Sequence, residues 1–542
     1  MKKLLTKLCL TATLFAAPWA SAETDTFGLG SGRNGALRVD HPTPINHYAQ
    51  VTAPVKAGNR TLRVDSLSGF EPGALIMVLQ STGMAQELNS GWEAPLELQT
   101  DAAGTFELAR VQSASDGVLT LTEPLVNAYE ALATQVVRVP EYTHVEVSAS
   151  GALQAQPWDG RTGGVLAFLA TGTITNHGRI EAAGMGFQGG DTSKDGDDTR
   201  KCSDLNETSP RGAKKGEGVA SPSLSGTGRG NAANAGGGGV CLMSGGGGGG
   251  HGGAGAQGGN SSDELDGARS VGGQGGVPLK YSAEKRLVFG GGGGAGHVGI
   301  ASVRTHSGDG DSPGQGHDEH GNGNGYGHCK GRGQGHDEEE CKLTVGTGES
   351  AGRGGGILFM RANQLSGTGV VSADGARGGD GMLSGGSGGG AGGIIHARFT
   401  GPAACGAMSA QGGAGGNSGS ASVRSGPGGG GGGGVIFFRA TSSSCPLSVT
   451  RGSTGTIPGA GESSHHGAGQ AQNGLIDALI EEPPPAEPPP SEPPPSEPPL
   501  PEPLPAEWTS HFEGSGCSAT GNAAPMFSLL LLVMTLISAR KR

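Results

Sequence analysis

The abundance of glycine constrains this chain more than any other feature. Glycine fills 110 of the 542 positions, whereas aromatic residues make up only 4%, so few large side chains are available for a hydrophobic core. The glycines follow no strict Gly-X-Y period, which excludes collagen, and strand-like apolar runs recur among them, which argues against a disordered chain. The sequence therefore predicts an architecture built from backbone more than from side chains.

The apolar runs form a degenerate repeat. Each unit starts with two glycines, continues with an apolar strand and ends with a second short strand. Because such a unit is too short to fold alone, it can bury its apolar row only by stacking on its neighbours. We therefore predict an all-β fold, with a right-handed parallel β-helix or related β-solenoid that turns at glycine corners. The units are GGVLAFLATGTITNHGRIEAAG from Gly163, GGILFMRANQLSGTGVVSADG from Gly355, GGIIHARFTGPAACGAMSAQG from Gly392 and GGVIFFRATSSSCPLSVTRG from Gly433.

The positions of two cysteines test how the repeat units align when they stack. Cys405 lies 11 residues after Ile394 and Cys445 lies 10 residues after Val435, so both take equivalent places in consecutive units. Stacked strands lie about 4.8 Å apart, which is within the Cα range of a disulfide, and an oxidising compartment favours such bonds. We predict a Cys405–Cys445 bond. The pairing of the other four cysteines of the exported body stays open: Cys202, Cys241, Cys329 and Cys341.

Two further regions flank or interrupt the repeat. Residues 23–142 have an ordinary composition and period-two stretches such as TLRV and ALIMVLQ, which predict a compact all-β domain ahead of a solenoid over residues 143–475. Between the first and second units lie glycine runs such as SGGGGGGHGGAGAQGG. These runs fit either ordered polyglycine-II helices, with three residues per turn, or a flexible linker.

Both ends of the chain indicate export. Residues 1–22 combine basic residues, an apolar run and a small-x-small cleavage site, as a secretory signal peptide does. Residues 476–513 are dominated by a proline–glutamate repeat, which predicts an extended polyproline-II stalk. Residues 514–542 join an apolar stretch to a basic end, as a terminal anchor or sorting signal does.

Residues 306–341 hold a concentration of polar side chains that bind metals. Imidazole and carboxylate groups here could coordinate zinc, and neighbouring acidic residues could bind calcium. The alternative is a solvated, low-complexity loop closed by a Cys329–Cys341 bond, because the glycine content argues against a preorganised site. The candidate metal ligands are His317, His320, His328, His336, Asp318 and Asp337.

Charge and motifs exclude several function classes. The formal net charge of −12 argues against a nucleic-acid partner, since phosphate binding needs a clustered basic surface. We predict no catalytic residues: the chain has no HExxH motif, and GxGxxG matches carry no information in a chain so rich in glycine. A polysaccharide-cleaving β-helix would gather carboxylates or bases on one face, whereas the repeat strands offer only Arg361, Arg398 and Arg439. We interpret these three as structural residues that could stack as an outward basic ladder.

The tail and the body each resemble a known family. The tail resembles the myxobacterial MYXO-CTERM sorting signal, which implies recognition by an intramembrane sortase-like protease, with processing or lipid modification at the cysteine. The body is similar to the AgmC family of myxobacterial adventurous gliding motility proteins, through DTFGLGSGRNGAL, TQVVRVPEYTHV, GGVLAFLATGTITNHG, RGAKKGEG, NAAN before GGGGV, LVFGGGGGAGH and GGGILF. The tail residues that carry the sorting resemblance are Gly516, Cys517, Ser518, Arg540, Lys541 and Arg542.

The expected function follows from both the residue patterns and the resemblances. We expect a non-enzymatic, exported protein that is displayed at the cell surface and acts in adhesion or gliding. Its expected partners are the sorting protease of the inner membrane, the membrane itself through the tail, and surface polysaccharide or other envelope proteins. The alternatives are a metal-binding envelope protein, through residues 306–341, and a polysaccharide-acting β-helix enzyme.

Overall fold

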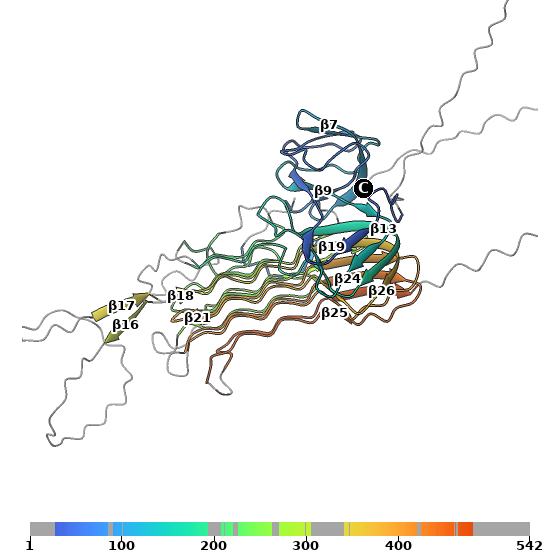
Figure 1. Cartoon of the computed structure of the whole chain (residues 1–542). Coiled ribbons are helices and arrows are strands. Elements are labelled where there is room, and N and C mark those ends of the chain that lie inside the picture. Colours follow the sequence, from blue (N-terminus) through green and yellow to red (C-terminus); the bar gives the residue numbers. More distant parts are fainter. Residues whose placement is uncertain are drawn as a thin grey trace, which may run out of the picture. The chain divides into compact units, whose positions relative to one another are not determined.

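A computed structural model of the chain describes residues 28–84, 90–99, 101–192, 208–210, 212–220, 226–262, 270–298, 300–304, 341–345, 347–419, 424–459, 461 and 464–480. These residues form strands, turns and extended glycine-rich segments, and none of them lies in an α-helix (Figure 1). The predicted all-β class is therefore confirmed for this part of the chain. Within it, no helix is long and apolar enough to cross a membrane.

Two parallel sheets share the repeat units between them. The long parallel sheet has the order β1-β11-β13-β19-β22-β24-β26, with β10 also paired to β13. Its strands are β1 (Leu37–Val39), β10 (Glu141–Tyr142), β11 (Val145–Val147), β13 (Val165–Asn176), β19 (Ile357–Ser366), β22 (Ile394–Phe399), β24 (Val435–Ala440) and β26 (Leu475–Ile480). The short parallel sheet has the order β2 (Pro42–Pro44), β12 (Ala152–Gln154), β14 (Arg179–Glu181), β20 (Val370–Ser372), β23 (Ala407–Ser409) and β25 (Leu447–Ser448).

Successive strands along the chain alternate between these sheets, so each repeat unit contributes one strand to each; we call such a pair a rung. All four predicted units form rungs, starting at β13, β19, β22 and β24. Rungs also form earlier, because β1 and β2 join the parallel sheets although they lie within residues 23–142. At the other end, β26 carries the long sheet to Ile480, past the predicted start of the stalk at residue 476.

A third sheet is antiparallel and is inserted between the first rung and β10. Its order is β3 (Tyr48–Gln50), β9 (Thr134–Arg138), β5 (Leu75–Gln80), β7 (Phe106–Ser115), β8 (Val118–Leu121) and β4 (Thr61–Arg63). The remaining strands form two-stranded pairs: β6 (Leu96–Glu97) with β15 (Leu279–Lys280), β16 (Ile300–Arg304) with β17 (Cys341–Val345), and β18 (Thr347–Gly348) with β21 (Gly381–Met382).

The hydrophobic core is layered because each strand turns alternate side chains to opposite faces. One cluster lies between the two parallel sheets and includes Leu153, Ile395 and Met408. A second lies on the opposite face of the long parallel sheet, where Phe359 meets Met77 of the antiparallel sheet and Phe289 of the glycine-rich part. The third covers the far face of the antiparallel sheet.

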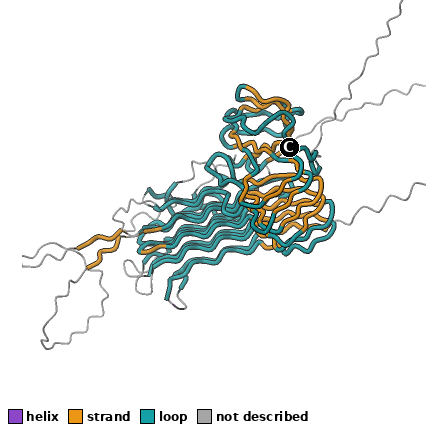
Figure 2. The backbone as a smooth tube through the Cα atoms, in the orientation of Figure 1, coloured by secondary structure: helices purple, strands orange, loops and turns teal. Residues whose placement is uncertain are grey.

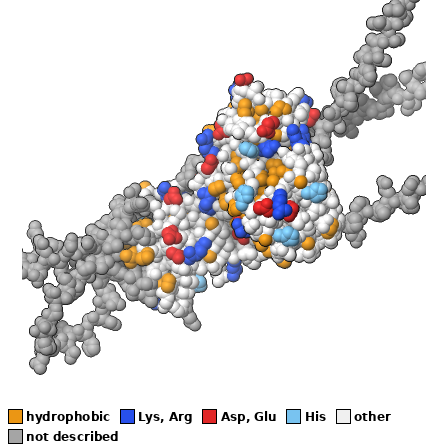
Figure 3. Space-filling model, viewed as in Figure 1, with side chains coloured by type: hydrophobic (Ala, Val, Ile, Leu, Met, Phe, Trp, Pro, Cys, Tyr) orange, Lys and Arg blue, Asp and Glu red, His pale blue; other side chains and the backbone are white. Residues whose placement is uncertain are grey.

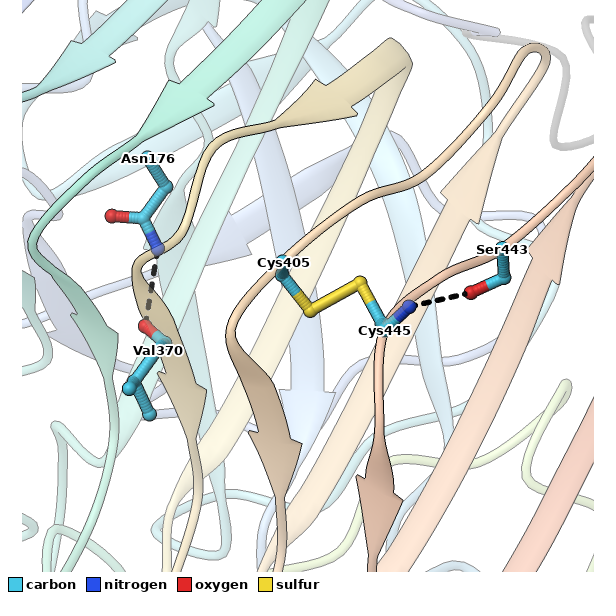
Figure 4. Close-up of a disulfide and its surroundings, with 5 residues drawn as sticks. All are labelled: Asn176, Val370, Cys405, Ser443 and Cys445. Atoms are coloured by element: carbon cyan, nitrogen blue, oxygen red, sulfur yellow. Dashed lines mark hydrogen bonds between the residues drawn. A yellow bond between two sulfur atoms is a disulfide. The ribbon is translucent and has the colours of Figure 1, made fainter.

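The register of the rungs confirms the predicted disulfide. β22 pairs with β24 in parallel, so Ile394 lies beside Val435, and the following corners bring Cys405 and Cys445 together with a Cα separation of 4.8 Å. Figure 4 shows this bond across adjacent rungs; at the same corner Cys445 N–H donates to Ser443. An earlier corner is held by Asn176, whose side-chain amide donates to Val370 O at 3.1 Å (Figure 4).

The glycine-rich segments pack against one another through their backbones. In the run from Gly245 to Gly250, every third N–H group points to the same neighbouring segment, so the six N–H groups donate to three segments in all. Gly246 and Gly249 donate to 386 and 389, Gly247 and Gly250 to 237 and 234, and Gly245 and Gly248 to 259 and 256. The carbonyls accept with the same period from three further segments, at 429 and 432, 294 and 291, and 273 and 276. Figure 2 shows these segments as parallel extended layers beside the strands.

This packing leaves no room for side chains. A Cβ added to Gly246 would lie 1.9 Å from Gly294 O, and one added to Gly388 would lie 2.0 Å from Gly247 O. Both distances are far below any real contact, so only glycine permits the segments to approach this closely. The glycine runs are therefore a structural core of their own, and the flexible-linker interpretation is wrong for the described runs.

Candidate functional site

A pocket lies where the antiparallel sheet, the loop between β12 and β13 and the glycine-rich layers meet. It encloses about 480 Å³, including its open mouth. Its walls combine two aromatic side chains, one carboxyl group and several glycine backbones, a mixture typical of small-molecule sites. The lining residues are Thr82, Leu132, Trp158, Gly160, Phe187, Gly216, Glu217, Gly218, Ala220 and Ala232.

Trp158 is fixed from several directions. Its side chain is 3% exposed and packs against Phe187 at a ring-centroid distance of 6.0 Å and against Phe289 at 5.3 Å. Trp158 N–H donates to Met185 O at 2.9 Å, and the Arg353 guanidinium donates to Trp158 O. Because both the ring and the backbone are held, the indole is preorganised before any ligand binds.

Glu217 meets this tryptophan although the two residues are 59 positions apart. Its Oε2 accepts hydrogen bonds from Trp158 Nε1 at 3.1 Å and from Gln188 N–H at 3.0 Å. Its backbone is locked into the glycine layers, since Glu217 N–H donates to Gln188 O and Glu217 O accepts from Gly292 N–H. Oε1 makes no hydrogen bond within the described residues and lies on the side of Gly160, at the pocket wall.

The surroundings of Glu217 shift the pKa of its carboxyl upward. Burial raises its pKa above the usual glutamate value, and the nearby Asp159 carboxylate acts in the same direction. The two hydrogen bonds to Oε2 and the positive charge of Arg353 oppose this effect without cancelling it. Oε1 is a hydrogen-bond acceptor at the pocket wall, so it suits a hydroxyl-bearing ligand.

The loop that carries Trp158 turns on glycines and is tied to the antiparallel sheet. Asp159 Oδ1 caps it by accepting from the N–H groups of Arg161 and Thr162, both at 2.8 Å. Gly163, with φ of 96°, donates to Gln135 Oε1 at 2.9 Å. A Cβ on Gly163 would lie 2.5 Å from Pro157 O, so this turn requires glycine.

Leu132 at the pocket lining is strained. It has φ of 64°, a left-handed conformation that a leucine rarely adopts, and its side chain is 63% exposed. Its backbone is held there, because Leu132 N–H donates to Val51 O and Leu132 O accepts from Gln50 Nε2 at 3.0 Å. An exposed apolar side chain kept in a strained conformation beside a pocket is typical of a binding site.

The structure places the residues singled out from sequence as follows. Arg361, Arg398 and Arg439 are register partners on β19, β22 and β24, as predicted, but the outward orientation is wrong for Arg361, which is buried on the face that packs against the antiparallel sheet. Arg361 is only 4% exposed, and its guanidinium lies 5.0 Å from the Phe359 ring centroid. Cys241 is buried and disulfide-bonded. The candidate metal ligands, Cys202, Cys329 and the sorting residues of the tail lie outside the described residues.

Among the described residues, no three His, Cys, Asp or Glu side chains come close enough to hold a metal ion. The charged groups on the surface are of mixed sign, and Figure 3 shows basic and acidic side chains interspersed on one face of the described body.

Sequence reasoning missed the Trp158–Glu217 pocket. The available signals were the Trp-Asp-Gly turn at residues 158–160, between β12 and the first repeat unit, and the lone glutamate in RGAKKGEG.

Comparison with known proteins finds few similarities. No protein-family model matches the chain, and no curated protein matches it. Three phage tailspikes are among the solved structures found. The gp54 tailspike of Acinetobacter baumannii bacteriophage AP22, solved with A. baumannii capsular saccharide, is 10% identical, with a TM-score of 0.16 over 27% of this chain and 28% of that one. Tailspike gp49 of Pseudomonas phage LKA1 is 13% identical, with a TM-score of 0.14 over 28% and 30%.

The third is the tailspike gp61 of Pseudomonas phage phi297, which is 10% identical, with a TM-score of 0.15 over 78% of this chain and 61% of that one. The chain thus spans less than two thirds of each tailspike. At these TM-scores the tailspikes define neither the fold nor the function of this chain.

Proposed function

We propose that this chain is an exported, non-enzymatic cell-surface protein that binds polysaccharide in the Trp158–Glu217 pocket and acts in adhesion or gliding. Its body is a right-handed parallel β-solenoid braced by polyglycine-II segments. The alternation of strands between two parallel sheets supports the solenoid, and the three-residue hydrogen-bond period of the glycine runs supports polyglycine II. The right hand is the one that parallel crossover connections take.

One observation carries the binding function: a partly buried carboxyl with one oxygen held by Trp158 and the other at the wall of a preformed pocket. Saccharides present hydroxyl groups beside apolar C–H faces, and a site for them needs hydrogen-bonding groups next to aromatic rings. Glu217 supplies the former, while the buried rings of Trp158 and Phe187 form the apolar wall behind it. The interlocked glycine layers beneath keep this geometry rigid.

Export and surface display rest on the sequence. The predicted signal peptide directs the chain out of the cytoplasm, and the tail from Gly516 to Arg542 holds it for a sorting protease. Fractionation of cells that carry Cys517→Ala tests this step, with intact mass measured on both forms. The variant should stay in the inner membrane, and equal fractionation of both forms would remove the sorting role.

Binding is tested by titrating the chain with a panel of purified bacterial surface polysaccharides, followed by tryptophan fluorescence and calorimetry. We expect Glu217→Gln, which keeps the shape but loses the titrating carboxyl, to weaken binding about tenfold. Glu146→Gln is the matched control, since Glu146 is exposed and pairs with Arg38 at the surface. Equal binding by the wild type and both variants, or no binding to any polysaccharide, would reject the pocket as the site.

A second candidate function, polysaccharide cleavage, is favoured by the raised pKa of Glu217 and by the Asp159 carboxylate next to Trp158. Glycoside hydrolysis uses such a pair, with one carboxylic acid and one carboxylate. The same polysaccharide panel distinguishes the candidates: new reducing ends that disappear in Glu217→Gln indicate an enzyme, whereas binding without shortening indicates an adhesin.

A further inference from the structure

The last strand of the long parallel sheet, β26, exposes an apolar surface. Its sequence is LIDALI, and it pairs with β24 along one edge; within the described residues no strand pairs with the other edge. Leu475, Ile476, Leu479 and Ile480 are 46–55% exposed. By contrast, Val435 and Ile436 of β24, the register partners of Leu475 and Ile476, are at most 3% exposed. An exposed apolar edge strand pairs readily with another strand.

The register between β24 and β26 shows that the hydrophobic core continues onto β26 and ends there, exposed. Ile476, Ala478 and Ile480 continue the column of Ile436, Phe438 and Ala440, which lies between the two parallel sheets. On the opposite face, Leu475 continues the column of Val435. The face of β26 that continues the core between the parallel sheets is thus wholly apolar, and the opposite face carries Leu475 and Leu479 on either side of Asp477; one more strand beside β26 would bury these apolar side chains.

The single charge on β26 does not protect the edge. Asp477 forms an ion pair with Arg439 of β24, at 3.0 Å, and the Arg439 guanidinium also donates to Asp477 O at 2.8 Å. Proteins usually guard an edge strand with unpaired charges or prolines. Here the acidic group is neutralised from within the same sheet.

The sequence that follows β26 does not repeat the pattern of the earlier units. The short-sheet strands start 13 residues after Ile394, at Ala407, and 12 residues after Val435, at Leu447. The same spacing from Leu475 falls at Glu487 and at Pro488, which is the first of three consecutive prolines. Proline has no N–H to donate to a ladder and is confined to edge strands such as β2 (Pro42–Pro44), so the repeat pattern ends here in the sequence.

We propose that β26 is a dimer interface, covered by β26 of a second copy of this chain related by a two-fold axis. The two strands run antiparallel, with Ala478 opposite Ala478 of the other copy and Ile476 opposite Ile480. Of the registers that keep the core faces aligned, this one pairs the most residues of β26 without placing Asp477 opposite Asp477, where like charges would repel. Pairing of β26 with β1 of another copy, head to tail, would involve only the three residues of β1 and could continue into a filament. A two-fold interface instead gives a closed dimer.

The interface does not depend on the proposed pocket function. It would join two copies end to end through one continuous long sheet, and would present two Trp158–Glu217 pockets on one particle. Two linked sites gain avidity on a polymeric ligand without any new contact.

The test is cysteine cross-linking in the full mature chain, with Cys517→Ala in every form. Antiparallel partners lie about 4.5–5.5 Å apart at Cα, which suits a disulfide. Ala478→Cys should give a covalent dimer on mild oxidation, whereas Met382→Cys, at a position 75% exposed and away from β26, should not. Equal cross-linking of the two variants, or a wild-type chain that is monomeric by light scattering at tens of micromolar, would overturn the proposal.

A second variant guards against chance cross-linking. Ile476→Lys with Ile480→Lys places four charges in the paired interface, while in the single chain both side chains already face solvent. We expect this form to be monomeric with an unchanged circular dichroism spectrum and melting temperature. A double variant that stays dimeric would overturn the proposal, and so would one that unfolds, because the exposed positions would then be core of the single chain.

Discussion

Arg110 of the antiparallel sheet and Glu141 of the long parallel sheet form a two-pronged ion pair. The guanidinium nitrogens lie 2.9 and 3.0 Å from the two carboxylate oxygens, and the Glu141 side chain is only 1% exposed. Glu141 also accepts from Ser31 N–H at 2.8 Å, and its own N–H donates to Asn34 Oδ1 at 2.8 Å. One carboxylate thus joins the N-terminal segment, the antiparallel sheet and the parallel sheets.

Removing Arg110 leaves this buried carboxylate without its counter-ion. We expect Arg110→Ala to lower the free energy of unfolding by about 3 kcal/mol, because a buried charge is then unpaired. Arg38→Ala serves as the control; that arginine is 62% exposed and forms surface pairs, which contribute less than about 1 kcal/mol. Urea unfolding measures both, and equal losses would mean that the Arg110–Glu141 pair does not hold the sheets together.

The glycine layers predict an unusual sensitivity to alanine. Gly388→Ala places a methyl group 2.0 Å from Gly247 O, and backbone on both sides prevents relief. We expect a loss of at least about 3 kcal/mol, the upper range for overpacked cores, or failure to fold. Gly226 is exposed, and a Cβ added to it would have no described atom within 4 Å, so Gly226→Ala should leave the melting temperature unchanged. Similar melting of both variants would contradict the interlocked packing.

The disulfide between adjacent rungs closes a segment of 40 residues. By the chain-entropy argument, such a cross-link stabilises the folded chain by about 4 kcal/mol. The double variant Cys405→Ala with Cys445→Ala should lose a stability of that order, as measured by urea unfolding under oxidising conditions. Single variants at either position should lose as much, and a chain as stable without the bond as with it would show that the rungs are fixed by other contacts.

Sequence reasoning succeeded where side chains mark the register. The apolar strands after paired glycines and the matched places of Cys405 and Cys445 predicted both the stacking and the disulfide, and Arg361, Arg398 and Arg439 do align. It could not locate the pocket, because Trp158 meets Glu217 only through lateral packing of glycine segments. Glycine runs carry no side-chain pattern, so they do not reveal which neighbour each run will have.

Two of the buried histidines, His251 and His396, lie among apolar and glycine-rich neighbours. His251 breaks a glycine run and lies between Gly392 O, 2.7 Å from Nδ1, and the Tyr281 hydroxyl, 2.6 Å from Nε2. His396 stacks between Phe359 and Phe437, with ring centroids 4.9 and 4.5 Å away, and its Nδ1 has no hydrogen-bond partner among the described residues. Burial lowers the pKa of His251 to about 4 and that of His396 to about 3, from the ordinary 6.5.

These lowered pKa values make the fold sensitive to acid. Below pH 6.5 both histidines take up protons in the unfolded chain but not in the folded one, so stability falls as the pH drops from 6.5 towards 4. At pH 4.5 each histidine would cost about 2–3 kcal/mol relative to neutral pH. His396→Phe completes the aromatic column of Phe359 and Phe437 and should remove its share of this loss, whereas His41→Gln, at an exposed position, should not. Urea unfolding at pH 7.5 and 4.5 measures the difference, and an unchanged pH dependence in His396→Phe would show that this ring is protonated in the folded chain.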